Sequence, residues 1–199
     1  MRVVDDYEQG RVSNQSKSLE FCGFRFSMSA LVSANRLLNV EAESTRALEL
    51  CGSALTENSG VSDFLQFSEG VCKWGRGQRV WGNLQRHHGS EGLANELRSW
   101  LLFAAKPCRD EEAIAKGAEI KGLGVSFASK HLRMLAPERY AVLDDVLQQG
   151  LGIALNPRGY RLFMSALRTL AGELEQPLKI ADLEAAVFLL VRQDVRAKS

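Results

Sequence analysis

Apolar residues recur every three or four positions along most of the chain after residue 27, the spacing that places them on one face of an α-helix. The clearest stretch has these apolar positions: Leu93, Leu97, Trp100, Leu101 and Ala104. Because proline disfavours helical geometry in the residue before it, we expect this helix to stop at Pro107.

Other helices are predicted from their capping residues together with their apolar faces. Ser44 and Thr45 are suited to cap one helix, Asp110 to open another, and Asn156 followed by Pro157 to start a third. Together, caps and periodicity predict helices over about these ranges: 44–55, 61–74 with an interruption near Gly70, 110–119, 125–135, 156–174 and 180–191.

The beginning of the chain follows a different pattern. Residues 1–18 are polar and predict an arm beside the folded body, whereas residues 19–26 alternate loosely with aromatic residues and predict a short extended piece. The folded body then spans 19–199. With about eight or nine helices and no other strand pattern, the predicted class is all-α.

Composition is that of an ordinary globular protein, with a net charge of +1 over 199 residues. A nucleic-acid binder of this balance must gather its positive charge locally. Residues 73–106 do so, with six basic residues against two acidic ones, an excess of four, and with His87 and His88 in addition. We interpret the two histidines as part of a basic surface rather than as metal ligands.

The four cysteines are spread along the chain, and no two have the C-x-x-C spacing of a metal site. We therefore interpret them as small buried hydrophobic residues and expect no metal ion. No apolar run approaches the roughly 20 residues of a membrane span, and no signal peptide is apparent. The expected protein is cytoplasmic, monomeric and without a membrane partner.

A short motif at 120–128, Ile-Lys-Gly-Leu-Gly-Val-Ser-Phe-Ala, lies between two predicted helices. Glycine at Gly122 and Gly124 lets the backbone turn with positive φ and leaves room for a ligand. The second of these helices presents unpaired N–H groups at its start, which hold anions. Such a helix, hairpin and helix can grip a phosphate through the backbone.

This pattern resembles the helix-hairpin-helix of the DNA glycosylase superfamily, most closely the small bacterial proteins with an 8-oxoguanine-glycosylase-like fold. The resemblance covers about residues 110–150. It implies a two-lobed helical bundle, with one lobe spanning about 60–150, the N- and C-terminal helices forming the other, and a cleft between them. It also implies that Lys121, Gly122, Leu123, Gly124 and Ser126 contact DNA, and that hairpin carbonyls hold a monovalent cation. No cysteine follows Cys108, so the iron–sulfur cluster of endonuclease III is not expected.

The family's catalytic aspartate follows the hairpin, and two adjacent acids are candidates here. Asp144 lies 18 residues after Ser126, the spacing of endonuclease III and the adenine glycosylases, whereas the 8-oxoguanine glycosylases run one residue longer and would select Asp145. The apolar flanks Leu143 and Leu147 favour Asp144. Asp is also a preferred helix N-cap, so a purely structural role for Asp144 is the competing interpretation.

Bifunctional family members carry a lysine nucleophile where this chain has Ser126, so the resemblance implies a monofunctional enzyme. Lys130 lies one helical turn further on and shares that face. It is the candidate amine for an alternative lyase activity, although a contact with phosphate or solvent is the interpretation we favour.

A predicted loop from Lys73 to Asn83 mixes glycines, arginines and two tryptophans. Arg76 and Arg79 are candidate phosphate contacts, and Trp74 and Trp81 are candidates for stacking on a flipped base. Equally, the tryptophans can belong to the core. Gln193 in the last helix is a further base-pocket candidate, because 8-oxoguanine glycosylases read the base with a glutamine there.

The leading hypothesis is a monofunctional DNA glycosylase that acts on double-stranded DNA containing a damaged or modified base. The setting is either DNA repair or defence against phage DNA, and no cofactor is needed beyond the cation that the resemblance implies. A non-catalytic helix-hairpin-helix module that binds DNA is the main alternative. A helical protein-interaction domain is the third, and it would show no salt-dependent DNA binding.

Overall fold

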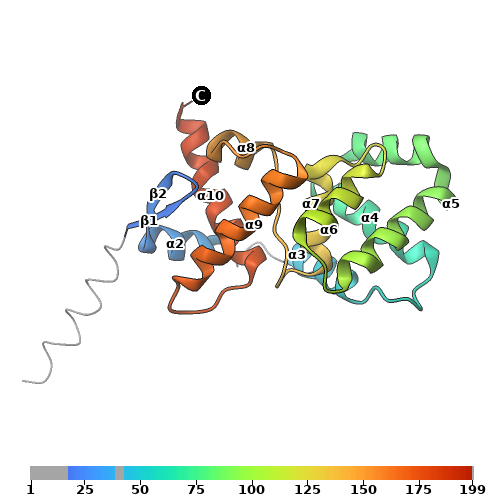
Figure 1. The fold of residues 1–199 in the computed structure, drawn as a ribbon, viewed down its shortest axis with the longest axis horizontal. Helices are drawn as coiled ribbons and strands as arrows, with labels where there is room; N and C mark the ends of the chain where they lie inside the picture. Colours follow the sequence, from blue (N-terminus) through green and yellow to red (C-terminus); the bar gives the residue numbers. More distant parts are fainter. Residues whose placement is uncertain (1–17, 39–42, 199) are drawn as a thin grey trace, which may run out of the picture.

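Nine helices and one antiparallel strand pair make up the part of the chain that the computed structural model describes, residues 18–38 and 43–198 (Figure 1). The elements, in chain order, are β1 (Ser18–Phe21), β2 (Phe24–Ser27), α2 (Met28–Leu38), α3 (Glu43–Ser53), α4 (Val61–Trp74), α5 (Gln78–Ala105), α6 (Asp110–Glu119), α7 (Gly124–Leu135), α8 (Asp145–Leu151), α9 (Pro157–Gly172) and α10 (Ile180–Lys198). The predicted mostly helical class is confirmed. Apart from Ser18, the predicted polar arm lies outside the described residues.

Several predicted boundaries are confirmed to within a few residues. α6 begins at Asp110, and α9 has Asn156 as its N-cap and Pro157 in its first turn, with the Asn156 side chain accepting the Gly159 N–H at 2.8 Å. The extended piece near the N-terminus is a hairpin, in which Ser18 pairs with Ser27. Local capping chemistry therefore located these helix ends correctly.

Four local predictions are wrong. Of the four cysteines expected to be buried, Cys22 and Cys51 are exposed and Cys108 is only partly buried. α4 runs without a break through Gly70, because this residue is partly buried under the Leu48 side chain of α3 and adopts helical geometry. Ser44 and Thr45 lie inside α3, which begins at Glu43, and do not cap it. The expected loop over 73–83 is only a turn at 75–77, since α5 begins at Gln78.

The helices gather at two ends of the molecule. Figure 1 shows α3 to α7 at one end, and β1, β2, α2, α8, α9 and α10 at the other. α3 packs on α7 and α4, whereas α10 packs on α2 and α8. The two ends are joined where α9 contacts α6, and there Arg168 donates to both carboxylate oxygens of Asp110, at 2.6 and 2.9 Å.

The segment 136–144 passes from one end of the molecule to the other, between α7 and α8, and its polar groups are fixed at several points. The Tyr140 hydroxyl donates to the Ala104 carbonyl at 2.9 Å, and the Tyr160 hydroxyl donates to the Ala141 carbonyl at 3.0 Å. Both tyrosines are fully buried. Because a buried hydroxyl must keep its hydrogen bond, the path of this segment toward Asp144 is tightly constrained.

Candidate active site

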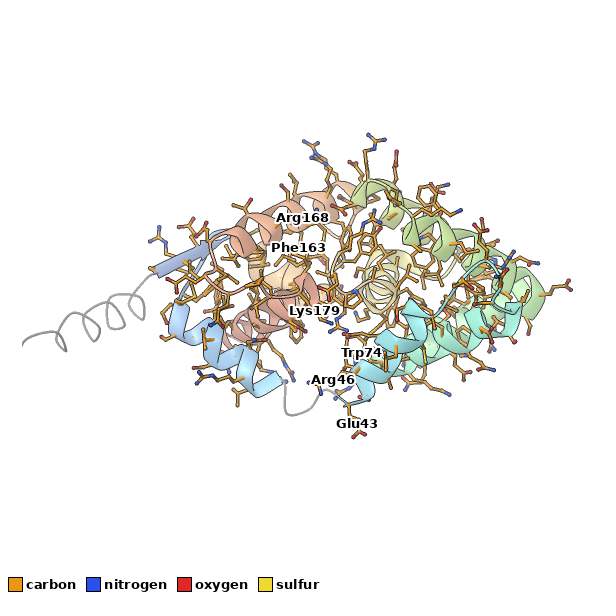
Figure 2. The ribbon with its side chains drawn as sticks, turned by 90° about the horizontal axis from the view of Figure 1, so that it is seen from below. Glu43, Arg46, Trp74, Phe163, Arg168 and Lys179 are labelled. Carbon is orange, nitrogen blue, oxygen red and sulfur yellow. The ribbon has the colours of Figure 1, made fainter. Side chains whose placement is uncertain are left out.

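A cleft of about 1230 Å³ opens beside segment 136–144 and is lined by side chains from both ends of the molecule. Figure 2 shows Trp74 and Arg46, from α4 and α3, near Lys179 just before α10, in the middle of the molecule. Asp144 and Lys130 also line this cleft. The predicted catalytic residue Asp144 is therefore accessible from this cleft.

Asp144 is the N-cap of α8 and also faces the cleft. Its Oδ1 atom accepts the N–H groups of Val146 and Leu147 at 3.1 and 3.2 Å. Its Oδ2 atom lies 3.9 Å from Lys130 Nζ, and its side chain is 19% exposed. Oδ1 therefore caps α8, whereas Oδ2 lies beside Lys130. Asp145 is exposed and does not line the cleft.

Lys130 extends along the cleft wall from the middle of α7. Its Nζ atom donates to Ser126 Oγ at 3.1 Å and lies 4.8 Å from the centre of the Phe127 ring. The turn at Gly75 packs so closely that an added Cβ would lie 2.8 Å from Lys130 Cδ. Burial lowers the pKa of Lys130, although the nearby Asp144 carboxylate opposes the shift. Lys130 is 8% exposed, so little of it contacts solvent, whereas its contact with phosphate stays a prediction.

The backbone just before Asp144 is tied to α7 by Ser129. The Leu143 N–H donates to Ser129 Oγ at 3.0 Å, and that hydroxyl lies 2.8 Å from the Ser126 carbonyl, to which it donates. Ser129 is fully buried. This tie sets where the Asp144 carboxylate points relative to Lys130, one residue further along α7.

Replacing Ser129 by alanine is expected to lower the free energy of unfolding by about 1–3 kcal/mol, because the buried Leu143 N–H loses its partner. Urea unfolding measures the effect. Ser99→Ala on the exposed face of α5 is the matched control and should change stability by less than about 0.5 kcal/mol. Equal stability of both variants would show that the tie is unimportant.

Glu184 on α10 reaches the cleft from the side opposite α7, and the sequence interpretation missed it. Its carboxylate accepts the Val142 N–H at 3.2 Å, and the residue is 3% exposed. Burial raises its pKa to about 7, against the influence of Arg133, which lowers it. A signal was available: Ile180, Glu184 and Val187 share helical spacing, so a lone carboxylate interrupts an apolar stripe.

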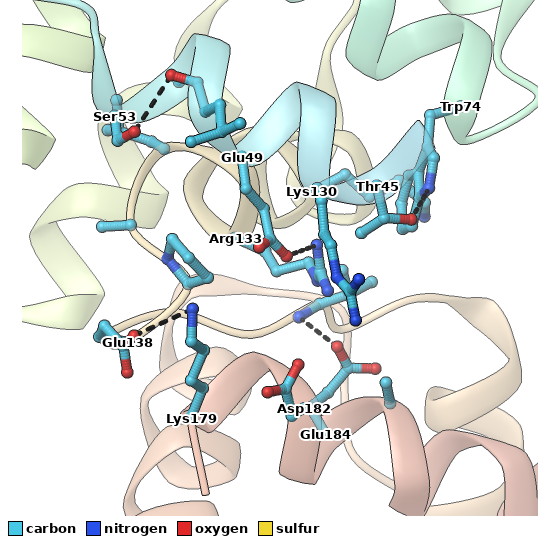
Figure 3. A pocket seen from close by; sticks show the side chains of 18 of the residues that line it. Thr45, Glu49, Ser53, Trp74, Lys130, Arg133, Glu138, Lys179, Asp182 and Glu184 are labelled. Atoms are coloured by element: carbon cyan, nitrogen blue, oxygen red, sulfur yellow. Dashed lines mark hydrogen bonds and ion pairs between the residues drawn. The ribbon is translucent and has the colours of Figure 1, made fainter. Parts of the chain in front are cut away.

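Arg133 completes the polar wall above Glu184, and Figure 3 shows both side chains together with Lys130 in the same pocket. Arg133 pairs with Glu49 of α3 at 2.8 Å, and its guanidinium carbon lies 5.6 Å from the centre of the Trp74 ring. Trp74 Nε1 in turn donates to Thr45 Oγ1 at 2.9 Å. Trp74 is thereby held as a wall of the cleft.

The turn between α6 and α7 has the backbone that its glycines predict. Gly122 has φ of 103° and Gly124 has φ of 66°, values that other residues rarely adopt. His88 Nε2 lies 2.9 Å from the Lys121 carbonyl and donates to it, which anchors the turn to α5. Lys121, Gly122 and Gly124 are exposed, but none of them lines the cleft.

Leu123 differs from the expected DNA contact. Its side chain is 3% exposed and belongs to the hydrophobic core, and its N–H donates to the Ile120 carbonyl at 3.0 Å. Both parts of the residue are already engaged within the protein. The N–H groups left for an anion are those of the first turn of α7, which begins at Gly124 and has no side-chain cap.

Some candidate residues of the segment 73–83 line the cleft and others lie away from it. Trp74 and Arg76 line the cleft, whereas Arg79 is exposed and does not. Trp81 is half-buried against the hydrophobic core, also away from the cleft. Gln193 is exposed near the end of α10 and does not line the cleft either. Of the base-pocket candidates, only Trp74 is brought to Asp144's cleft.

The resemblance implies that carbonyl oxygens of the turn hold a monovalent cation. The Ile120 and Lys121 carbonyls each accept one hydrogen bond already, from Leu123 and His88, and each retains a second lone pair. A monovalent cation at these carbonyls stays a prediction. Within 18–38 and 43–198, no group of three or more His, Cys, Asp or Glu side chains is placed to hold a metal ion.

Across the same described ranges, no helix combines the length and apolar character that crossing a membrane requires. No family model, curated protein or solved structure matches this chain.

Proposed function

We propose that this protein is a DNA glycosylase that hydrolyses the N-glycosidic bond of a damaged or modified base flipped out of double-stranded DNA. The observation that carries the proposal is Asp144: one carboxylate oxygen faces a cleft large enough for a base, beside the ammonium group of Lys130. We propose further that it acts as a cytoplasmic monomer, in repair or in defence against phage DNA.

The turn at 121–124 is proposed to act as a helix-hairpin-helix clamp that binds a DNA phosphate at the start of α7. The exposed Lys121 supplies a positive charge, and the first turn of α7 supplies N–H groups that favour an anion. Such contacts position a DNA strand without reading its sequence. When this turn holds the DNA strand, the base of the flipped nucleotide is proposed to enter the cleft that Asp144 lines.

Bond cleavage leaves positive charge on the sugar as the base departs. The Asp144 Oδ2 atom is free of the helix cap and can stabilise that charge, or activate a water that attacks the anomeric carbon. Trp74, held by Thr45 and Arg133, offers an aromatic wall for the base.

Mass spectrometry of bases released from genomic DNAs with different modification chemistry tests the proposal. Release of one class of base by the purified protein supports it. Salt-dependent DNA binding without release from any of these DNAs favours the non-catalytic DNA-binding module. Absence of such binding favours a protein-interaction domain.

A second candidate, glycosylase with lyase activity, is favoured by one observation: Lys130 is buried in the cleft, with its Nζ 3.9 Å from Asp144 Oδ2 and a lowered pKa. An amine with a lowered pKa is more often neutral and nucleophilic at neutral pH. Borohydride reduction of a reaction mixture would then trap a covalent protein–DNA adduct.

For the monofunctional enzyme, we expect borohydride to trap no adduct, and Lys130→Met to keep a measurable rate of base release. Lys121→Met, which removes an exposed amine outside the cleft, is the matched control. A trapped adduct that disappears in Lys130→Met, but not in Lys121→Met, would assign the lyase and locate its amine.

A further inference from the structure

Glu184 is the most deeply buried carboxyl group that lines the cleft, at 3% exposed. Two positively charged side chains on α7 face it, those of Lys130 and Arg133. The Asp144 carboxylate faces it from the start of α8. On its own helix, Asp182 also lines the cleft. Arg133 is already paired with Glu49 of α3, so it does not serve Glu184 alone.

Burial outweighs these positive neighbours and raises the pKa of Glu184 to about 7. Near neutral pH the carboxyl group therefore still holds its proton in part of the molecules, whereas an ordinary glutamic acid has lost it. A group whose pKa lies near the working pH is suited to give and regain a proton during catalysis.

We propose that Glu184 is the proton donor to the departing base, and that the enzyme acts on neutral bases that leave only after they are protonated. This inference rests on the proposed glycosylase function. It adds a residue to which the hairpin-and-aspartate resemblance assigns no role. Glu184 and Asp144 line the same cleft from different elements. This arrangement allows Glu184 to face the base while the Asp144 carboxylate faces the sugar.

In this step, the bond between the anomeric carbon and the base nitrogen breaks, and its electron pair stays with the base. Glu184 gives its proton to a ring nitrogen or oxygen of that base, which departs neutral. Water adds to the anomeric carbon and gives one proton to the Glu184 carboxylate, directly or through Asp144. The enzyme returns to its starting state, and one water molecule is consumed.

Glu184→Gln separates this role from a structural one. Glutamine keeps an oxygen that can accept the Val142 N–H, but it carries no transferable proton. Asp194→Asn is the control, because it removes a carboxylate from the same helix at a position that does not line the cleft. Thermal unfolding first establishes that both variants fold.

The experiment measures single-turnover release of the base identified by mass spectrometry, from a duplex oligonucleotide, between pH 5 and pH 9. The wild-type rate is expected to fall about tenfold per pH unit above about pH 7. Glu184→Gln should be about 10²–10⁴-fold slower at pH 6 and lack this decline, with duplex affinity within about threefold of the wild type. Asp194→Asn should behave as the wild type.

A wild-type rate and pH profile in Glu184→Gln would overturn this inference and leave the glycosylase proposal intact. Release of only cationic, N-alkylated bases would also overturn it, because such bases leave without protonation. If the wild-type protein releases no base at all, both proposals fail together.

Discussion

Replacing Asp144 by asparagine is expected to slow base release by about 10²–10³-fold while the protein keeps its stability. Asparagine caps a helix as well as aspartate does, so its side-chain oxygen can still accept the Val146 and Leu147 N–H groups. The variant loses only the negative charge that faces the cleft. Removing a group that stabilises developing charge lowers kcat by about 10²–10³-fold, and mass spectrometry of released bases measures the loss.

Asp145→Asn is the matched control for this experiment. Asp145 is the adjacent acid, exposed and away from the cleft, and its replacement should leave the rate of base release unchanged. Full activity in Asp144→Asn, or loss of activity only in Asp145→Asn, would contradict the assignment.

Acid is expected to destabilise the protein through His131. This ring is fully buried, with Nδ1 2.7 Å from the Phe127 carbonyl and Nε2 2.6 Å from Ser68 Oγ. The neutral ring satisfies both contacts, by donating from Nδ1 and accepting at Nε2. Burial lowers the pKa of His131 from 6.5 to about 4.

Between pH 6.5 and 4, the unfolded chain takes up a proton at this histidine that the folded chain does not. The stability contributed by the neutral ring is therefore complete above pH 6.5 and is lost as the pH falls toward 4, by about 3 kcal/mol. Urea unfolding across this range, in wild type and His131→Phe, gives the loss as the change in their difference. The exposed His87→Phe should show no loss of comparable size.

Glu184 has the opposite dependence, because its folded pKa of about 7 lies above that of the unfolded chain. Its contribution is complete below about pH 4.5 and is lost as the pH rises toward 7. Between pH 4.5 and 6.5 the two residues offset one another. The His131 loss is therefore partly masked in the wild type, and subtracting the variant's stability reveals it.

The features that the sequence predicted well depend on neighbours in the chain. Positive φ at Gly122 and Gly124 follows from glycine itself, and the N-cap at Asn156 follows from a side chain three residues from its partner. The two oxygens of Asp144 show why a local pattern left its role undecided. A cap and a cleft-facing carboxylate are compatible in one residue.

The features that the sequence did not predict depend on packing between distant segments. Glu184 accepts a hydrogen bond from Val142, 42 residues away, and the interrupted apolar stripe of α10 marks Glu184 without identifying this partner. Trp81 and Trp74 lie in one segment with similar neighbours. Trp74 faces the cleft because α4 packs there against Thr45 of α3 and Arg133 of α7, whereas Trp81 packs against the core.

One helix, α7, begins at the glycine turn, bears Lys130 on the cleft wall and fixes the backbone ahead of Asp144 through Ser129. Since each residue added to a helix rotates the remainder of that helix by about 100°, a single insertion between 124 and 129 would rotate Ser129 and Lys130 together relative to the glycine turn. The number of residues in that interval therefore fixes how the glycine turn is oriented relative to Lys130 and Asp144.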